Sequence, residues 1–195
     1  TKKLEGTLKV VTTGDAYQPL FDKFTEEVGP KVEFISMSSG EVLSKLKAEG
    51  GTPAADLWFG GGIDAFMDAK DNDLLEKVDF DAADELAPEF KDSDNYWFSK
   101  GVTVVGFIVN NDILKEKGLE APKSWDDLTK EEYQGEVLMS NPAISGTNYA
   151  VVNALLQTKG DEEGWKYFEA LNKNVDYYSK RGSDPSTKTA AGEVG

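Results

Sequence analysis

Strand-like and helix-like segments alternate three times in residues 7–75 of the chain. The strand-like segments are short apolar runs that end at glycine or serine, and they cover residues 7–14, 31–37 and 55–62. The helix-like segments carry apolar residues at helical spacing, and they cover residues 17–29, 38–51 and 63–75. This alternation predicts an α/β fold with mostly parallel sheets and flanking helices, because parallel strands are joined by crossover helices.

In such sheets a ligand binds beyond the carboxyl ends of the strands. Three polar segments follow the three predicted strands, namely residues 13–15 (Thr-Gly-Asp), 38–40 (Ser-Ser-Gly) and 59–61 (Phe-Gly-Gly). We expect these segments to lie at one edge of the sheet.

The second half of the chain continues the α/β pattern. Residues 96–112 are the longest strand-like stretch, which we interpret as one long strand or two. Shorter strands are expected at residues 136–140 and from Val175, and helices are expected at residues 145–160, at residues 161–174 and after Pro185. We predict two domains with a boundary near Gly101, lobe one at residues 1–100 and lobe two at residues 101–195.

Two predicted helices open with a serine-glycine step, at residues 38–40 in lobe one and at residues 145–147 (Ser-Gly-Thr) in lobe two. The first N–H groups of a helix have no partner within the helix and carry a partial positive charge. Oxygen atoms of an anion or a polyol can bind there. The alternative is that these serines are ordinary helix caps.

Two aromatic features also allow two interpretations. Residues 58–62 (Trp-Phe-Gly-Gly-Gly) are a core aromatic followed by a turn, or a loop that approaches a ligand, but they lack the spacing of the known nucleotide-binding motifs. Tyr177 and Tyr178 are a stacking or metal-binding pair, or simply the inward and outward residues of a strand.

Composition excludes several classes of protein. With 36 acidic and 21 basic residues the chain carries a net charge of −15, which disfavours nucleic-acid binding. It contains no cysteine and no histidine, so disulfides, zinc fingers, cysteine nucleophiles and Ser-His-Asp triads are excluded.

No apolar run approaches the roughly 20 residues of a membrane span, and no signal peptide is visible. Carboxylates are plentiful, but none forms a spacing that singles out a catalytic pair.

Three segments resemble a known family: "ADLWFGGG" at 55–62, residues 101–150 with "PKSW" and "NPAISGTNYA", and "VDYYSKRGSDPSTKTAAGEVG" at 175–195. They are similar to bacterial extracellular solute-binding proteins of ABC importers, in the ferric-iron-, hexose-phosphate- and phosphonate-binding branch of the type II periplasmic binding proteins. The resemblance implies two α/β lobes joined by a hinge, with the ligand held between them. Members of this family are longer, so we expect the C-terminal part of the fold, which returns to lobe one, to be missing.

The resemblance and the strand-end argument together give the candidate ligand-binding residues. They are Thr13, Gly14, Ser38, Ser39, Gly40, Gly60, Gly61, Ser145, Gly146, Thr147, Asn148 and Ser183. No catalytic residue, metal ligand or cofactor is expected.

The resemblance implies the solute-binding component of an ABC transporter, periplasmic or extracellular, with a cognate permease as partner. The loop "TTGDAYQ" at residues 12–18 contains no histidine, and "WFGGG" is similar to the phosphorylated-solute branch, so an anionic sugar phosphate or phosphonate is favoured. A ferric-iron binder, a sugar-phosphate enzyme and a sensor module are the alternatives. Further expectations are a lost lipid anchor, a monomeric full-length protein and a swapped dimer of a fragment.

Overall fold

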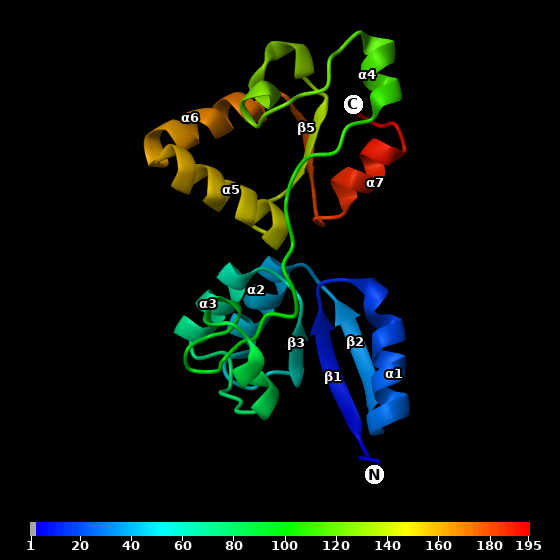
Figure 1. Cartoon of the computed structure of the whole chain (residues 1–195), viewed down its shortest axis with the longest axis vertical. Helices are drawn as coiled ribbons and strands as arrows, with labels where there is room; N and C mark the ends of the chain where they lie inside the picture. Colours follow the sequence, from blue (N-terminus) through cyan, green and yellow to red (C-terminus); the bar gives the residue numbers. More distant parts are fainter. Residues whose placement is uncertain (1–2) are drawn as a thin grey trace. The chain divides into compact units, whose positions relative to one another are not determined.

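The computed structural model describes residues 3–195 and divides into two compact units, Thr1–Thr103 (unit 1) and Val104–Gly195 (unit 2). Each unit is an α/β structure with its own parallel sheet, as the alternation of segments predicts (Figure 1). The two units are described separately below. No helix of residues 3–195 is long and apolar enough to cross a membrane.

Unit 1 contains a three-stranded sheet in the order β2-β1-β3, with both pairs parallel. Its strands are β1 (Thr7–Thr12), β2 (Lys31–Ser36) and β3 (Leu57–Phe59), and its helices are α1 (Gln18–Val28), α2 (Ser39–Glu49) and α3 (Ile63–Asp71). Three short 3-10 turns complete it at Asp15–Tyr17, Asp81–Glu85 and Pro88–Phe90. Because all three strands run in one direction, their carboxyl ends meet at one edge of the sheet (Figure 1).

The core of unit 1 lies between the sheet and its helices. Val11 of β1 packs with Val42 and Leu46 of α2, and all three side chains are buried. Phe21 of α1 packs against Phe34 of β2, with ring centroids 5.1 Å apart. These apolar positions therefore face the core, whereas Leu20 of α1 and Ile35 of β2 are exposed.

The acidic segment at residues 79–94, which follows α3, forms ion pairs with Lys70 of that helix. Lys70 Nζ lies 2.8 Å from a carboxylate oxygen of Asp92 and 2.8 Å from one of Asp94. Burial raises the pKa of the Asp92 carboxyl, but the hydrogen bond from Lys70 and those from the N–H groups of Tyr96 and Asp94 together hold that pKa below its usual value. These contacts connect the segment to α3.

Unit 2 contains a two-stranded parallel sheet in which Val137 pairs with Val175 and Ser140 with Ser179. Its strands are β4 (Val137–Ser140) and β5 (Val175–Ser179), and its helices are α4 (Asn111–Lys117), α5 (Gly146–Lys159), α6 (Asp161–Asn172) and α7 (Asp184–Ala190). Two 3-10 turns, Asp126–Thr129 and Glu131–Tyr133, precede β4. The helices surround the sheet in Figure 1.

The core of unit 2 is a cluster of buried side chains from β4, α5, α6 and the first 3-10 turn. It consists of Leu128, Met139, Val151, Leu155, Tyr167 and Leu171. The buried Asn174 amide donates to the main-chain carbonyls of Leu128 and Lys130, each at 2.7 Å, so this polar group is satisfied. The second unit therefore has a hydrophobic core of its own.

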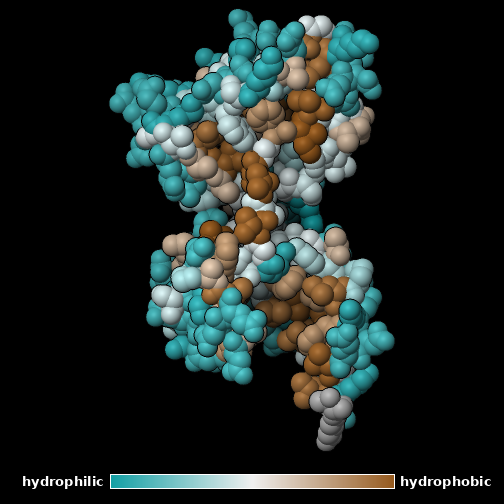
Figure 2. All heavy atoms as spheres, viewed as in Figure 1, coloured by the Kyte–Doolittle hydropathy of each residue, from teal (hydrophilic) through white to brown (hydrophobic). Residues whose placement is uncertain are grey.

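The prediction of one or two strands at residues 96–112 is wrong. Within the described residues this stretch pairs only through an isolated bridge between Phe98 and Lys91, and residues 101–110 have no regular structure. Val104 is 94% exposed and Ile108 63% exposed. The residue types favour a strand, but a strand also needs a neighbouring edge with which to exchange hydrogen bonds. Figure 2 shows hydrophobic side chains, in brown, on the visible surface of the molecule.

Candidate functional site

Three segments of unit 1 converge at the carboxyl edge of its sheet. The Thr13 N–H donates to the Phe59 carbonyl at 3.3 Å, which joins the ends of β1 and β3. Gly60 and Gly61 follow with φ values of +92° and +121°, a region that glycine adopts without strain. A Cβ atom on Gly61 would lie 2.7 Å from the Ser39 hydroxyl oxygen, so the start of α2 touches the end of β3.

Glycine is needed at both positions because the neighbours are so close. A Cβ atom on Gly60 would lie 2.5 Å from the Thr13 hydroxyl oxygen. The segments 13–15, 38–40 and 59–61 therefore do lie together, as the parallel-strand argument predicts. Gly14, next to Thr13, accepts the Thr12 hydroxyl and packs against the Tyr17 ring.

The neighbouring serines Ser38 and Ser39 have different roles. Ser38 is the N-cap of α2 and forms a capping box, in which its side chain accepts the Glu41 N–H and the Glu41 carboxylate accepts the Ser38 N–H at 3.0 Å. Ser39 is the first helical residue and is 4% exposed. Within residues 3–195 its hydroxyl has no hydrogen-bond partner. Gly40 follows, and its carbonyl accepts the Ser44 hydroxyl at 2.8 Å.

The corresponding place in unit 2 is the start of α5 beside the end of β5. Ser145 is the N-cap and is 2% exposed, and its hydroxyl accepts from the Asn148 N–H at 3.4 Å. A Cβ atom on Gly182 would lie 2.6 Å from the Thr147 hydroxyl oxygen and 3.2 Å from that of Ser145. The turn after β5 thus lies directly against the first turn of α5.

A buried serine fixes this turn. Ser140, at the end of β4, is fully buried, and its hydroxyl lies 3.0 Å from the Ser179 hydroxyl of β5. The same hydroxyl donates to the Arg181 carbonyl. This bond holds Arg181, the only arginine in the sequence, beside the start of α5.

Two of the predicted unit 2 residues have other local roles. Asn148 is 8% exposed, and its amide donates to the Ser145 hydroxyl at 3.4 Å, which makes it part of the cap. The Ser183 carbonyl accepts the hydroxyls of Ser186 and Thr187, and Ser183 itself is exposed just before α7. Asn148 thus belongs to the start of α5, and Ser183 belongs to the start of α7.

Both helix starts offer donors without partners. In residues 3–195, no hydrogen bond uses the main-chain N–H of the first two residues of α2 or of α5. These residues are Ser39, Gly40, Gly146 and Thr147. The hydroxyls of Thr13, Ser39 and Thr147 are likewise unused within the described chain. Each unit therefore presents N–H and O–H donors together, an arrangement that suits an electron-rich oxygen.

Charged groups near the unit 1 donors are of both signs. Asp64 lies in the first turn of α3, after the glycines, and burial raises the pKa of its carboxyl. Lys100 was missed by the sequence analysis. Its ammonium lies 2.8 Å from the Tyr17 hydroxyl and close to Gly60, although 83 positions separate it from Tyr17. No local sequence signal marks such a long-range contact.

The tyrosine pair divides between two sides of β5. The Tyr177 hydroxyl donates to Glu193 at 3.1 Å, and the Tyr178 hydroxyl donates to Asn172 of α6 at 2.6 Å. This is the alternating arrangement of strand residues rather than a pair that acts together. Within the described residues no group of three or more acidic side chains is placed to hold a metal ion.

Comparisons with known proteins agree with this architecture. Residues 53–193 match the family described as bacterial extracellular solute-binding protein. An uncharacterized protein of Haemophilus influenzae is 34% identical, over 88% of this chain and 51% of that protein. The Fe(3+)-binding periplasmic protein of Serratia marcescens is 28% identical, over 89% of this chain and 50% of that protein. The solved periplasmic binding protein AfuA from Actinobacillus pleuropneumoniae, with fructose-6-phosphate bound, has a TM-score of 0.92 at 31% identity, over 97% of this chain and 61% of that chain.

The chain spans about half the length of these curated relatives. The family match nevertheless covers most of the chain, and the solved structure matches nearly all of it. The family and the names of its members place the protein in the periplasm or outside the cell. The chain belongs to the bacterial extracellular solute-binding protein family and has the fold of the type II periplasmic binding proteins.

Proposed function

We propose that this protein is the solute-binding component of an ABC importer and that it captures a small anionic organic solute, a sugar phosphate or a phosphonate. The observation that carries the proposal is the group of N–H and O–H donors at the starts of α2 and α5 that have no partner within residues 3–195. Its partners are the solute and a cognate permease, and it performs no chemistry on the solute.

The donors favour an anion for two physical reasons. Main-chain N–H groups at a helix start point outward with a partial positive charge, and they can donate to phosphate oxygens without any rearrangement. The hydroxyls of Ser39 and Thr147 add donors at fixed positions, because the glycines Gly61 and Gly182 pack against them. These local donors act at hydrogen-bond distance, where they outweigh the diffuse repulsion from the net charge of −15.

The comparisons support the phosphate class and also keep one alternative. AfuA, which is 31% identical, holds fructose-6-phosphate in its solved structure, whereas the Serratia marcescens relative is named for ferric iron. Ferric iron is a hard cation and requires anionic oxygen ligands. Donor groups such as those of α2 and α5 repel a bare cation, so we favour the phosphorylated solute.

Isothermal titration calorimetry of the full-length gene product with fructose 6-phosphate, methylphosphonate, inorganic phosphate and ferric citrate tests the proposal. We expect a phosphorylated or phosphonate solute to bind. Thr147→Val keeps the side-chain shape but removes the hydroxyl, so the affinity for that solute should fall about tenfold, as for a hydrogen bond to a charged group.

Thr158→Val is the matched control, because Thr158 lies at the other end of α5 and its hydroxyl bonds to the Ala154 carbonyl of the same helix. It should leave the affinity unchanged. Binding of ferric citrate alone, or equal affinities of the Thr147→Val protein and the wild type, would contradict the proposal.

A further inference from the structure

Lys100 adds a positive charge to the carboxyl edge of the unit 1 sheet. Its Nζ atom donates to the Tyr17 hydroxyl at 2.8 Å and lies 4.9 Å from the centre of the Tyr17 ring. The same atom lies 5.5 Å from the centre of the Phe59 ring, at the end of β3. A Cβ atom on Gly60 would lie 3.6 Å from Lys100 Cε, so the lysine lies beside the glycines that approach Thr13 and Ser39.

Within the part of the chain that the structure describes, the Lys100 ammonium has no carboxylate partner. Many lysines of the described chain form ion pairs, such as Lys70 with Asp92 and Lys130 with Asp127. Within residues 3–195, Lys100 contacts only the neutral phenol and the two ring faces. An ammonium has three donors, and the Tyr17 hydroxyl uses one of them. A full positive charge with free donors is therefore available at this edge.

The aromatic rings hold the lysine in place without neutralising it. Tyr17 packs edge-on against Phe59 with ring centroids 5.0 Å apart, so the ring that supports Lys100 is itself fixed to the end of β3. Ring faces attract a cation only weakly where solvent has access, and an anionic oxygen competes successfully with them. The ammonium can keep one donor on the Tyr17 hydroxyl while its other two donors bind the oxygens of a ligand.

On this basis, and resting on the proposed function, we propose that Lys100 is a specificity-determining residue that binds the charged oxygens of the solute in unit 1. It selects a phosphate or phosphonate ester over the uncharged parent compound. Tyr17 is a positioning residue that keeps the ammonium at the sheet edge. The hydroxyls and main-chain amides bind any oxygen-rich solute, whereas Lys100 supplies the preference for negative charge.

Calorimetric titration of the full-length gene product with fructose 6-phosphate and with fructose tests this role. Lys100→Gln should lower the affinity for fructose 6-phosphate about tenfold or more, as expected for a charge-assisted hydrogen bond, and should flatten its dependence on sodium chloride. Lys100→Arg should retain most of the affinity. Circular dichroism and urea unfolding should be unchanged, because the lysine is exposed.

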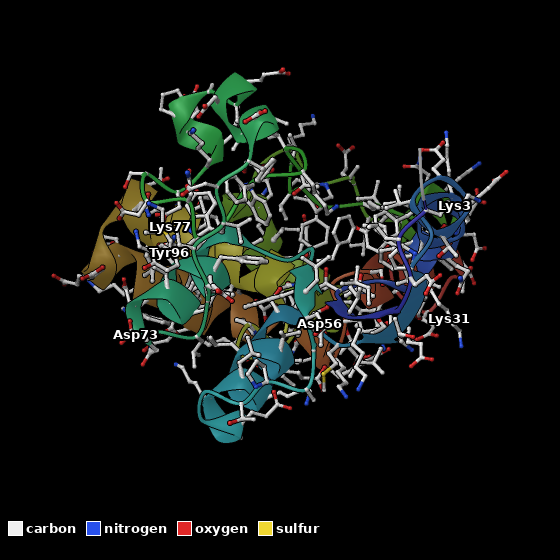
Figure 3. The ribbon with its side chains drawn as sticks, turned by 90° about the horizontal axis from the view of Figure 1, so that it is seen from below. Lys3, Lys31, Asp56, Asp73, Lys77 and Tyr96 are labelled. Carbon is white, nitrogen blue, oxygen red and sulfur yellow. The ribbon has the colours of Figure 1, made fainter. Side chains whose placement is uncertain are left out.

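Lys31→Gln is the matched control. Lys31 begins β2 at the opposite edge of the same sheet and is labelled in Figure 3, so the variant makes the same change in net charge away from the donors. It should not change either affinity. Tyr17→Phe keeps the ring and removes the hydroxyl. It should weaken fructose 6-phosphate binding in the wild type but not in the Lys100→Gln background, because the effect passes through the lysine.

The outcomes separate the two proposals. If the wild type binds fructose 6-phosphate and Lys100→Gln binds it equally well, the role of Lys100 is overturned and the proposed function stands. The same holds if Lys31→Gln has as large an effect as Lys100→Gln. If the wild type binds no phosphorylated or phosphonate solute, or binds fructose as tightly as its phosphate, the anionic-solute function fails and the role of Lys100 fails with it.

Discussion

Ser38 and Ser39 are adjacent, yet replacing them by alanine should separate stability from binding. Ser38→Ala removes the side chain that accepts the Glu41 N–H at the start of α2. Loss of such a cap costs about 1 kcal/mol. For a unit of about 100 residues this corresponds to a decrease in melting temperature of about 4–8 °C. Affinity for the solute should change little, because the cap serves the helix.

Ser39→Ala should instead lower the affinity for the solute and leave the stability nearly unchanged. The Ser39 hydroxyl has no partner within residues 3–195 and contacts Gly61, so its removal should change the free energy of unfolding by no more than about 0.5 kcal/mol. If the hydroxyl donates to a charged oxygen of the solute, its loss costs about 1.5 kcal/mol of binding free energy, slightly more than tenfold in affinity.

Urea unfolding followed by tryptophan fluorescence gives the stabilities, and calorimetry with fructose 6-phosphate gives the affinities. The double variant should show both effects, the lower stability of Ser38→Ala and the lower affinity of Ser39→Ala, because the two hydroxyls act on different partners. Equal destabilisation by Ser39→Ala and Ser38→Ala, or an equal loss of affinity in the two variants, would refute these separate roles.

Two further predictions concern unit 2. Gly182→Ala places a methyl group 2.6 Å from the Thr147 hydroxyl oxygen, so the first turn of α5 must shift. Calorimetry should show at least a tenfold loss of solute affinity. Unchanged affinity would exclude that close contact. The Asp127 carboxylate accepts hydrogen bonds from the Lys130 ammonium and from the Lys123 N–H. These two bonds, the Lys130 bond being the stronger influence, lower the pKa of the carboxyl to about 2. Because the folded pKa lies below the unfolded one, its contribution is complete above about pH 4 and is lost as the pH falls towards 2. Asp127→Asn should therefore lower stability at pH 7 and have little effect near pH 2, which urea titrations at both pH values would check; an equal loss at both would contradict the assignment.

The α/β fold is predictable from sequence where local pattern and tertiary contact agree. Val11, Val42 and Leu46 follow the periods of strand and helix, and they form the buried contact between β1 and α2. The serine-glutamate spacing of Ser38 and Glu41 is a local signal for a helix start, and the capping box is present. The family resemblance is confirmed by the match over residues 53–193.

Non-local interactions limit the prediction elsewhere. Residues 101–110 have strand-forming side chains, but strand formation depends on a partner edge that no local pattern specifies. Lys100 meets Tyr17 across 83 positions, so its place beside Gly60 becomes visible only in three dimensions. For the candidate site, the rule for parallel strands predicted that Thr13, Ser39 and Gly61 lie together. That these residues bind a solute stays a prediction.

The unpartnered N–H groups at the starts of α2 and α5 belong to the main chain, which has a consequence for how such a protein evolves. Side-chain replacement does not delete a main-chain donor unless proline is introduced. A basal attraction for electron-rich atoms therefore survives most sequence drift. On the proposed assignment, discrimination among solutes would be set by a few replaceable groups, namely the hydroxyls of Ser39 and Thr147 and the ammonium of Lys100. New transport specificities can then arise by exchange of a few side chains while both hydrophobic cores remain intact.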